Sequence, residues 1–312
     1  MIQKTDLQQT IKKAIILEGV GLHTGKNVTL RFEPAPENTG YVFVRDDLEG
    51  TPEILADVQY VVNTDRGTNL EKDGVKIQTS EHVLAALVGL QIDNCFIHLD
   101  ASEPPIMDGS SKYFIEAIEK AGVEKQEKPR EEYVVDEVIC FKDEESGSEI
   151  TIIPSESYQI TTMVDFGTKI LGTQNATLDN LSDFKGEIAP ARTFSFLHEL
   201  EMLLDHGLIK GGDLNNAIVY VDKPLSEETT EKLKKAFNKD HISIKPNGVL
   251  DNLTLHFSNE AARHKLLDVI GDLALIGTRI RGHVIAKKPG HRVNTMFADK
   301  VAKLIKHDKR LN

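Results

Sequence analysis

Three polar side chains recur at four-residue spacing in an otherwise apolar stretch near the C-terminal end: His264, Asp268 and Asp272. On an α-helix, residues four apart project from the same face, so the three would lie in one row. An imidazole and a carboxylate placed in this way can hold one metal ion, with further ligands from elsewhere. The spacing also fits a solvated stripe with hydrogen bonds between histidine and aspartate, and both interpretations stay open at this point.

A second candidate is the dipeptide Glu81-His82, at the expected start of a helix. One side chain of such a pair can hold a metal ion while the other takes a proton from water. A glutamate in a first helical turn is also ordinary helix-dipole chemistry, so the dipeptide alone decides little. His82 and His264 are 182 residues apart. A shared site would therefore lie between the two halves of the chain, where ligand clefts are common.

Two more histidines stand beside glycines, His291 in KKPGH (287–291) and His23 in GVGLHTG (19–25). Glycine permits tight loops that could carry an imidazole into a cleft, and the two lysines could offset phosphate charge. Each pattern alone is more typical of a surface turn. The chain has no P-loop, no Gly-x-Ser-x-Gly elbow and no His-Glu-x-x-His helix. These absences exclude three common classes of site.

Hydrophobic periodicity predicts the elements that must position these residues. A helix capped by Thr79 or Ser80 should carry Glu81-His82, and a helix over 262–276 should carry His264. Strands and helices are mixed without regular βαβ alternation, which favours an α+β fold. The other expected helices cover 110–121, 195–205 and 227–237, and the expected strands cover 14–17, 28–32, 41–44, 92–99, 133–141, 149–153 and 158–166.

The chain has 312 residues, enough for about two domains. The charged stretch 123–132 (VEKQEKPREE) is the best linker candidate, so we expect a domain over 1–125, a linker over 126–132 and a domain over 133–305. The net charge of −12 argues against nucleic-acid binding. Two cysteines are too few for a thiolate zinc site or a disulfide framework. Without a signal peptide or a membrane-spanning apolar run, the chain should be a soluble protein of a reducing compartment.

Short motifs are spread along nearly the whole chain. The first half contains GVGLHTG (19–25), TSEH (79–82), GLQIDN (89–94) and EPPIMDGS (103–110). The second half contains ARTF (191–194), GG (211–212), NAIV (216–219), RHKLLD (263–268), GDL (271–273) and GH (290–291). Together and in this order, they resemble the zinc-dependent UDP-3-O-acyl-N-acetylglucosamine deacetylases of lipid A biosynthesis.

The resemblance implies two α+β domains, each a sheet layered with helices, and one catalytic Zn²⁺ in a cleft between them. The implied zinc ligands are His82, His264 and Asp268, with water in the open position that catalytic zinc requires. Glu81 is implied as the general base that deprotonates this water.

The remaining catalytic roles are implied for four residues of the second half. A protonated His291 would stabilise developing charge and give a proton to the leaving amine, and Asp272 would orient its imidazole. Thr193 would help to stabilise the oxyanion. Lys265 would lie near the polar groups of the substrate.

The implied substrate is an acylated UDP-sugar, which loses its N-acetyl group as acetate in the committed step of lipid A biosynthesis. Phe166 would stack on the uracil beside Asp165, and Lys288 would contact the diphosphate. The segment 208–217 would line a tunnel for the acyl chain. The substrate-contacting residues are then Phe194, Phe166, Asp165, Lys288, Gly212 and His23.

The resemblance also implies the cytoplasm of a Gram-negative bacterium, with at most transient contact with a membrane surface. Some relatives continue into a hydroxyacyl-carrier-protein dehydratase domain, so a fused dehydratase is a candidate partner. The segment 223–246 interrupts the family pattern with a charged helical stretch of unknown purpose. Two alternatives remain, a zinc amidohydrolase acting on another amide and a non-catalytic protein that binds zinc and a nucleotide sugar.

Overall fold

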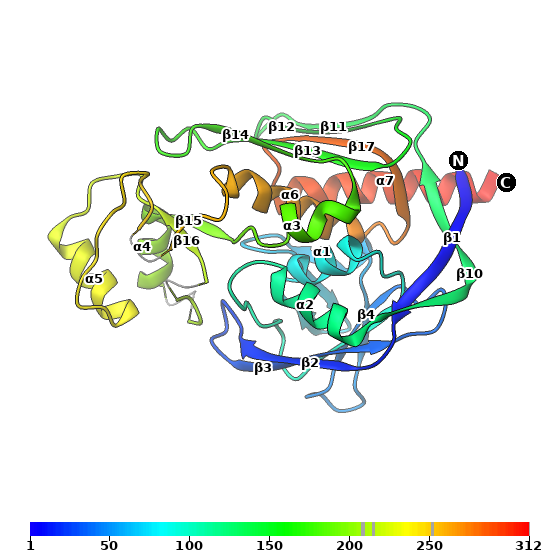
Figure 1. Ribbon diagram of the computed structural model, residues 1–312, viewed down its shortest axis with the longest axis horizontal. Helices are drawn as coiled ribbons and strands as arrows, with labels where there is room; N and C mark the ends of the chain where they lie inside the picture. Colours follow the sequence, from blue (N-terminus) through cyan, green and yellow to red (C-terminus); the bar gives the residue numbers. More distant parts are fainter. Residues whose placement is uncertain (207–209, 214–215, 251–252, 312) are drawn as a thin grey trace.

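A layer of helices lies between two β-sheets in the computed structural model, which describes residues 1–206, 210–213, 216–250 and 253–311 (Figure 1). The larger sheet has the order β1-β10-β17-β12-β11, and β13 and β14 extend it from β17. The smaller sheet has the order β2-β3-β9-β4-β5. Helices α6 and α7 contact strands of the larger sheet, and α2 contacts the smaller one. This mixture confirms the predicted α+β class.

Among the described residues, the strands fall into four sheets. The larger sheet contains β1 (Ile2–Ile11), β10 (Val123–Val134), β11 (Ile139–Asp143), β12 (Ser148–Ile153), β13 (Tyr158–Asp165), β14 (Thr173–Leu178) and β17 (Arg279–Lys287). The smaller sheet contains β2 (Ile15–Val20), β3 (Asn27–Pro34), β4 (Tyr41–Arg45), β5 (Glu53–Leu55) and β9 (Cys95–Leu99). One minor sheet contains β6 (Val61–Asn63), β7 (Asn69–Lys72) and β8 (Val75–Ile77). The other contains β15 (Phe194–Phe196) and β16 (Ile218–Tyr220).

The helices connect and cover these strands. They are α1 (Glu81–Gly89), α2 (Lys112–Ala121), α3 (Phe184–Glu187), α4 (Leu197–Asp205), α5 (Glu227–Phe237), α6 (Glu260–Ala274) and α7 (His291–Leu311), with short 3₁₀ turns at Val58–Tyr60 and Leu181–Asp183. None of the described helices is both long and apolar enough to cross a membrane.

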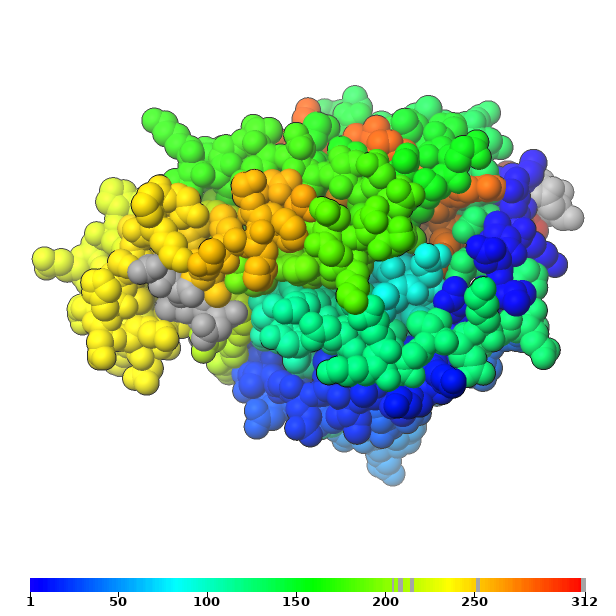
Figure 2. All heavy atoms as spheres, viewed as in Figure 1, coloured from blue at the N-terminus to red at the C-terminus, as the bar shows by residue number. Residues whose placement is uncertain are grey.

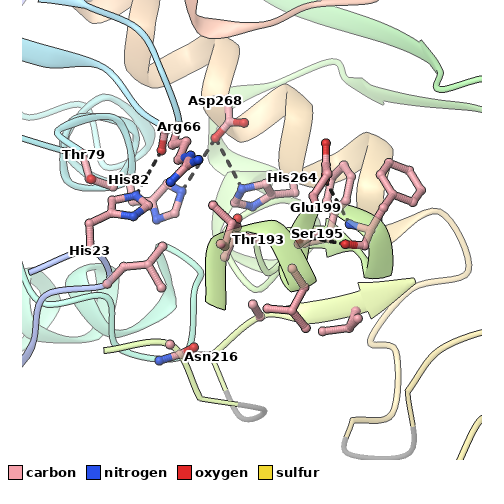
Figure 3. Close-up of a pocket in the computed structure, with 18 of the residues that line it drawn as sticks. His23, Arg66, Thr79, His82, Thr193, Ser195, Glu199, Asn216, His264 and Asp268 are labelled. Carbon is pink, nitrogen blue, oxygen red and sulfur yellow. Dashed lines mark hydrogen bonds and ion pairs between the residues drawn. The ribbon is translucent and has the colours of Figure 1, made fainter. Parts of the chain in front are cut away.

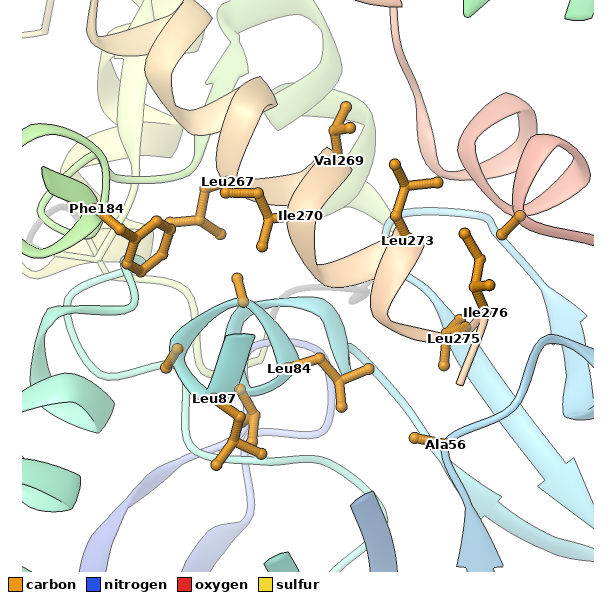
Figure 4. Packing of buried hydrophobic residues seen from close by; sticks show 14 of the residues in the cluster. Ala56, Leu84, Leu87, Phe184, Leu267, Val269, Ile270, Leu273, Leu275 and Ile276 are labelled. Atoms are coloured by element: carbon orange, nitrogen blue, oxygen red, sulfur yellow. The ribbon is translucent and has the colours of Figure 1, made fainter. Parts of the chain in front are cut away.

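Helices α1 and α6 pack against each other in the centre of the main hydrophobic core (Figure 4). Leu84 and Leu87 of α1 belong to the same buried cluster as Leu267 and Ile270 of α6. A helix that is buried on most sides must be apolar around most of its circumference. Helix α6 is buried in this way, and most of its buried residues are apolar. The polar row at 260, 264, 268 and 272 is the exception among its buried residues.

Gly271 allows this close approach, because a Cβ added there would lie 2.1 Å from the carbonyl oxygen of Glu81. We expect Gly271→Ala to lower the free energy of unfolding by about 1–3 kcal/mol, since backbone must move to admit the methyl group. Urea unfolding would measure the loss. Gly186→Ala is the matched control, because a Cβ on that helical glycine meets nothing within 4 Å. Equal stability of the two variants would contradict this account of the α1–α6 contact.

Three local predictions differ from the structure. The stretch expected as a linker forms β10, because its backbone pairs with β1 and with β17 while most of its charged side chains face solvent. The strand expected over 133–141 is interrupted between β10 and β11. The helix expected from residue 195 starts at Leu197, because the preceding residues pair with β16 as β15.

The expected cap of α1 also differs. Ser80 occupies the N-cap position, but no side-chain capping hydrogen bond forms there. Its hydroxyl instead donates to the carbonyl oxygen of Thr68 at 3.0 Å. The division of the chain into two domains stays a prediction.

The segment 223–246, which interrupts the expected family pattern, contains α5 with the predicted bounds. It belongs to a lobe at one end of the molecule (Figure 2, yellow). Leu233 of α5 is buried in a small apolar cluster with Leu197 and Leu200 of α4. Phe237, at the end of α5, packs against this cluster.

Candidate metal centre

His82, His264 and Asp268 converge at the contact between α1 and α6 (Figure 3). One oxygen of Asp268, Oδ1, lies 3.7 Å from Nε2 of His82 and 3.4 Å from Nε2 of His264. All three side chains are buried, with residue exposures of 6%, 2% and 1%. Asp268 Oδ1 has no hydrogen-bond partner in the described part of the chain. A buried carboxylate oxygen facing two imidazole nitrogens fits a divalent cation.

The protonation of these groups suits a metal site. Burial lowers the pKa of His264 to about 3, so its imidazole is neutral at physiological pH. Its Nδ1 lies 3.0 Å from the carbonyl oxygen of Ala191, which leaves Nε2 as the ligand atom. Burial alone would raise the pKa of Asp268, but the charge of Lys265, 2.7 Å away, helps to hold it well below its ordinary value. Two imidazoles and a carboxylate are a donor set that zinc sites in proteins commonly use.

Glu81 and His291 lie beside the metal-ligating group. Oε1 of Glu81 is 3.8 Å from Nε2 of His291, whose Nδ1 is 3.0 Å from Oδ2 of Asp272. Burial alone would lower the pKa of His291, but the negative charges of Asp272, Glu81 and Asp268 raise it to about 9. Burial raises the pKa of Glu81, although His291 and His82 oppose the shift. The arrangement therefore combines an imidazole that is protonated near neutral pH with a carboxyl group of increased basicity.

A cavity of about 410 Å³ opens onto this group. Thr193 lines it, with its backbone hydrogen-bonded to the carbonyl oxygen of Gly109 at 2.7 Å and to the amide of Ile218 at 2.9 Å. Lys265 lines it too, with its ammonium 5.6 Å from the ring centre of Phe194. Away from the metal-ligating group the wall is largely apolar, with Leu200, Met202, Leu203, Val219 and Phe237.

Four of the six predicted substrate-contacting residues line this cavity: His23, Phe166, Phe194 and Gly212. The ring of Phe166 is partly exposed and packs edge-on against Phe194, with centroids 5.4 Å apart. Asp165 and Lys288 are not among the residues that line the cavity. They form an ion pair with each other at 3.9 Å. Part of the segment 208–217 lies outside the described residues.

Sequence reasoning missed several residues of the site, among them Arg66, Thr68 and Phe237. Arg66 and Phe237 line the cavity. Thr68 does not line it but donates hydrogen bonds to Glu81 and Asp272. Arg66 and Thr68 flank Gly67, whose φ of +155° is in the region that favours glycine. The glycine is a local signal of a turn there, but nothing in the spacing places that turn against Glu81.

Comparisons with known proteins agree with the motifs. The family model described as LpxC: UDP-3-O-acyl N-acetylglycosamine deacetylase matches residues 8–239 and 229–303. A protein of Myxococcus xanthus named UDP-3-O-acyl-N-acetylglucosamine deacetylase is 40% identical over 296 residues, which cover 94% of this chain and 86% of that protein.

Two other relatives are named bifunctional enzyme LpxC/FabZ. The one from Bacteroides thetaiotaomicron is 46% identical over 299 residues, and the one from Chlorobaculum tepidum is 46% identical over 305. These matches cover 96% and 97% of this chain but only 65% of each relative. By family model, identity and coverage, the chain belongs to the LpxC family of UDP-3-O-acyl N-acetylglycosamine deacetylases.

Proposed function

We propose that this chain hydrolyses the N-acetyl group of UDP-3-O-(3-hydroxyacyl)-N-acetylglucosamine, releasing acetate in the committed step of lipid A biosynthesis. The observation that carries the proposal is Asp268 Oδ1, buried without a hydrogen-bond partner among the described residues and facing two imidazoles. We propose zinc as the metal, held by His82, His264 and Asp268. Bound there, zinc would supply a Lewis acid that polarises the amide carbonyl and acidifies water.

The chain's own residues supply the proton transfers in this proposal. Glu81 accepts a proton from the water molecule that attacks the acetyl carbonyl. His291, kept protonated by Asp272, donates a proton to the amine nitrogen as its bond to the acetyl carbon breaks. The hydroxyl of Thr193 donates to the carbonyl oxygen while negative charge develops on it. Lys265 stabilises the Asp268 carboxylate and faces the polar part of the substrate.

The cavity has surfaces that suit both ends of the proposed substrate. The partly exposed ring of Phe166 is available to stack on uracil. Asp165 and Lys288, which do not line the cavity and pair with each other, would separate to contact the ribose and the diphosphate. The apolar wall, which includes Phe237 of α5, suits an acyl chain. Segment 223–246 would therefore help to form the acyl-binding surface.

Comparing UDP-N-acetylglucosamine with and without its 3-O-acyl chain tests this proposal. We expect kcat/KM to be at least roughly 100-fold higher for the acylated sugar, because each buried methylene contributes about 0.8 kcal/mol. Equal values would favour an amidohydrolase with another substrate. Metal binding without hydrolysis of either sugar would favour a non-catalytic protein that binds zinc and a nucleotide sugar.

The pH dependence of kcat/KM should be bell-shaped. The rate should fall at low pH as Glu81 takes up a proton, and at high pH as His291 loses its proton near pH 9. In Asp272→Asn, the lost negative charge should move the pKa of His291 from about 9 toward 6.5, so the alkaline limb shifts to lower pH. A profile that is flat between about pH 5 and 9, or an alkaline limb unmoved by Asp272→Asn, would contradict these roles.

We further propose that the protein acts in the cytoplasm with a fused hydroxyacyl-carrier-protein dehydratase as its partner. The relatives named as bifunctional LpxC/FabZ enzymes support the second point. We retain as part of this proposal two domains over 1–125 and 133–305, joined by residues 126–132 within β10.

A further inference from the structure

Thr68 directs all of its hydrogen-bonding groups at the residues around the proposed catalytic site. It is completely buried in the loop between β6 and β7. Its backbone N–H donates to Oε2 of Glu81 at 2.9 Å, and its hydroxyl donates to Oδ1 of Asp272. Its carbonyl oxygen accepts from the amide of Ser80 at 3.2 Å and from the Ser80 hydroxyl at 3.0 Å. One residue thus ties the start of α1 to the polar face of α6.

The hydroxyl of Thr68 supplies the hydrogen bond to one of the two oxygens of the buried Asp272 carboxylate. Oδ2 of Asp272 faces Nδ1 of His291 at 3.0 Å and accepts from Nδ2 of Asn294 at 2.8 Å. Oδ1 is held by Thr68, whose hydroxyl also lies 3.4 Å from Nδ1 of His291. With both oxygens held, rotation of the carboxylate would break a hydrogen bond in a buried site, which is costly. Thr68 and Asn294 therefore hold the carboxylate that faces His291 from two sides.

The neighbouring glycine lets this loop reach Glu81. A Cβ added at Gly67 would lie 3.1 Å from Oε1 of Glu81, and the φ of +155° already disfavours other residues. Glu81 is thereby oriented, with Oε2 on the amide of Thr68 and Oε1 toward His291. The proposed base lies on α1 and the imidazole at the start of α7, so no single element sets their separation.

We propose that Thr68 is a positioning residue that couples the two proton-transfer groups, orienting Glu81 through its amide and His291 through Asp272 by its hydroxyl. The inference rests on the proposed function, because it assigns Thr68 a part in that reaction. Partners that hold the groups around a metal site typically affect activity by roughly 10–100-fold. The effect should fall on kcat, since Thr68 is not among the residues that line the cavity.

Thr68→Val is the informative variant, because it removes the hydroxyl while keeping the side-chain shape and the backbone amide. With the metal-loaded protein and the acylated sugar, we expect kcat to fall roughly 10–100-fold with little change in KM or metal content. Thr68→Ser keeps the hydroxyl and should restore most of the rate. In an Asp272→Asn background, Thr68→Val should cost much less than it does alone, because the hydroxyl acts through that carboxylate. The proposal would be overturned if Thr68→Val had the wild-type kcat or if Thr68→Val and Thr68→Ser lost kcat equally. It would also be overturned if the losses of kcat in Thr68→Val and Asp272→Asn were additive.

A second measurement is independent of turnover. The imidazole Nδ1–H of His291, observed by NMR, should lose its hydrogen-bonded downfield resonance or broaden in Thr68→Val and keep it in Thr68→Ser. If wild-type protein fails to hydrolyse the sugar, the proposed function falls, and this resonance still tests the role of Thr68. If the wild type is active but the resonance and kcat of Thr68→Val are unchanged, only the positioning role falls.

Discussion

Replacing Glu81 with glutamine should lower kcat by roughly 10²- to 10⁴-fold, the usual contribution of a positioned general base. The amide has nearly the shape of the carboxylate, so its oxygen can still accept from the backbone of Thr68. It cannot take up a proton from water at neutral pH. Because Glu81 is not one of the three metal-ligating residues, the variant should still bind one metal ion per chain. Steady-state kinetics with the acylated UDP-sugar, alongside metal analysis, would measure both outcomes.

Glu116→Gln provides a matched control for the loss of a carboxylate. Glu116 lies on α2, exposed and paired with Lys112 at 4.0 Å, so this substitution should leave kcat unchanged. A Glu81→Gln protein that binds metal normally and turns over at the wild-type rate would show that Glu81 is not the base.

Replacing His264 with alanine should abolish stoichiometric metal binding. The wild type should retain one zinc ion per chain after dialysis, and the variant should retain almost none, because two protein ligands remain. The loss of affinity should exceed the roughly 10–100-fold typical for an outer-shell partner. Metal analysis of the purified proteins measures this directly, without any assumption about substrate. Hydrolysis should be lost together with the metal.

His307→Ala controls for the removal of an imidazole. The side chain of His307 is 70% exposed on α7, so this variant should keep its metal and its activity. Circular dichroism should show that His264→Ala remains folded, because an unfolded protein would lose its metal for a trivial reason. Folded His264→Ala that still carries one ion per chain would refute the metal site.

Most of the secondary structure was predictable where neighbouring residues control it. Helix α5 has the predicted bounds, and the hydroxyl of Ser226 accepts from the amide of Thr229 to cap it. Prediction failed where the partner is distant in sequence. Residues 123–134 form a strand because β1 and β17 pair with them, and no local pattern in that charged stretch indicates those partners. Ser80 donates to Thr68 instead of capping α1, for the same reason.

The sequence by itself determined which side chains share a face. Helical periodicity places His264, Asp268 and Asp272 in one row, and the motifs resembling the family added His82 and Glu81 as their partners. Only the tertiary structure decided how these groups meet. Their distances depend on the packing of α1 against α6, which Gly271 permits, and on a loop that brings Thr68 to both Glu81 and Asp272. Periodicity is a property of neighbours along the chain, whereas these contacts join segments up to 204 residues apart. Such contacts form only when the whole core has packed.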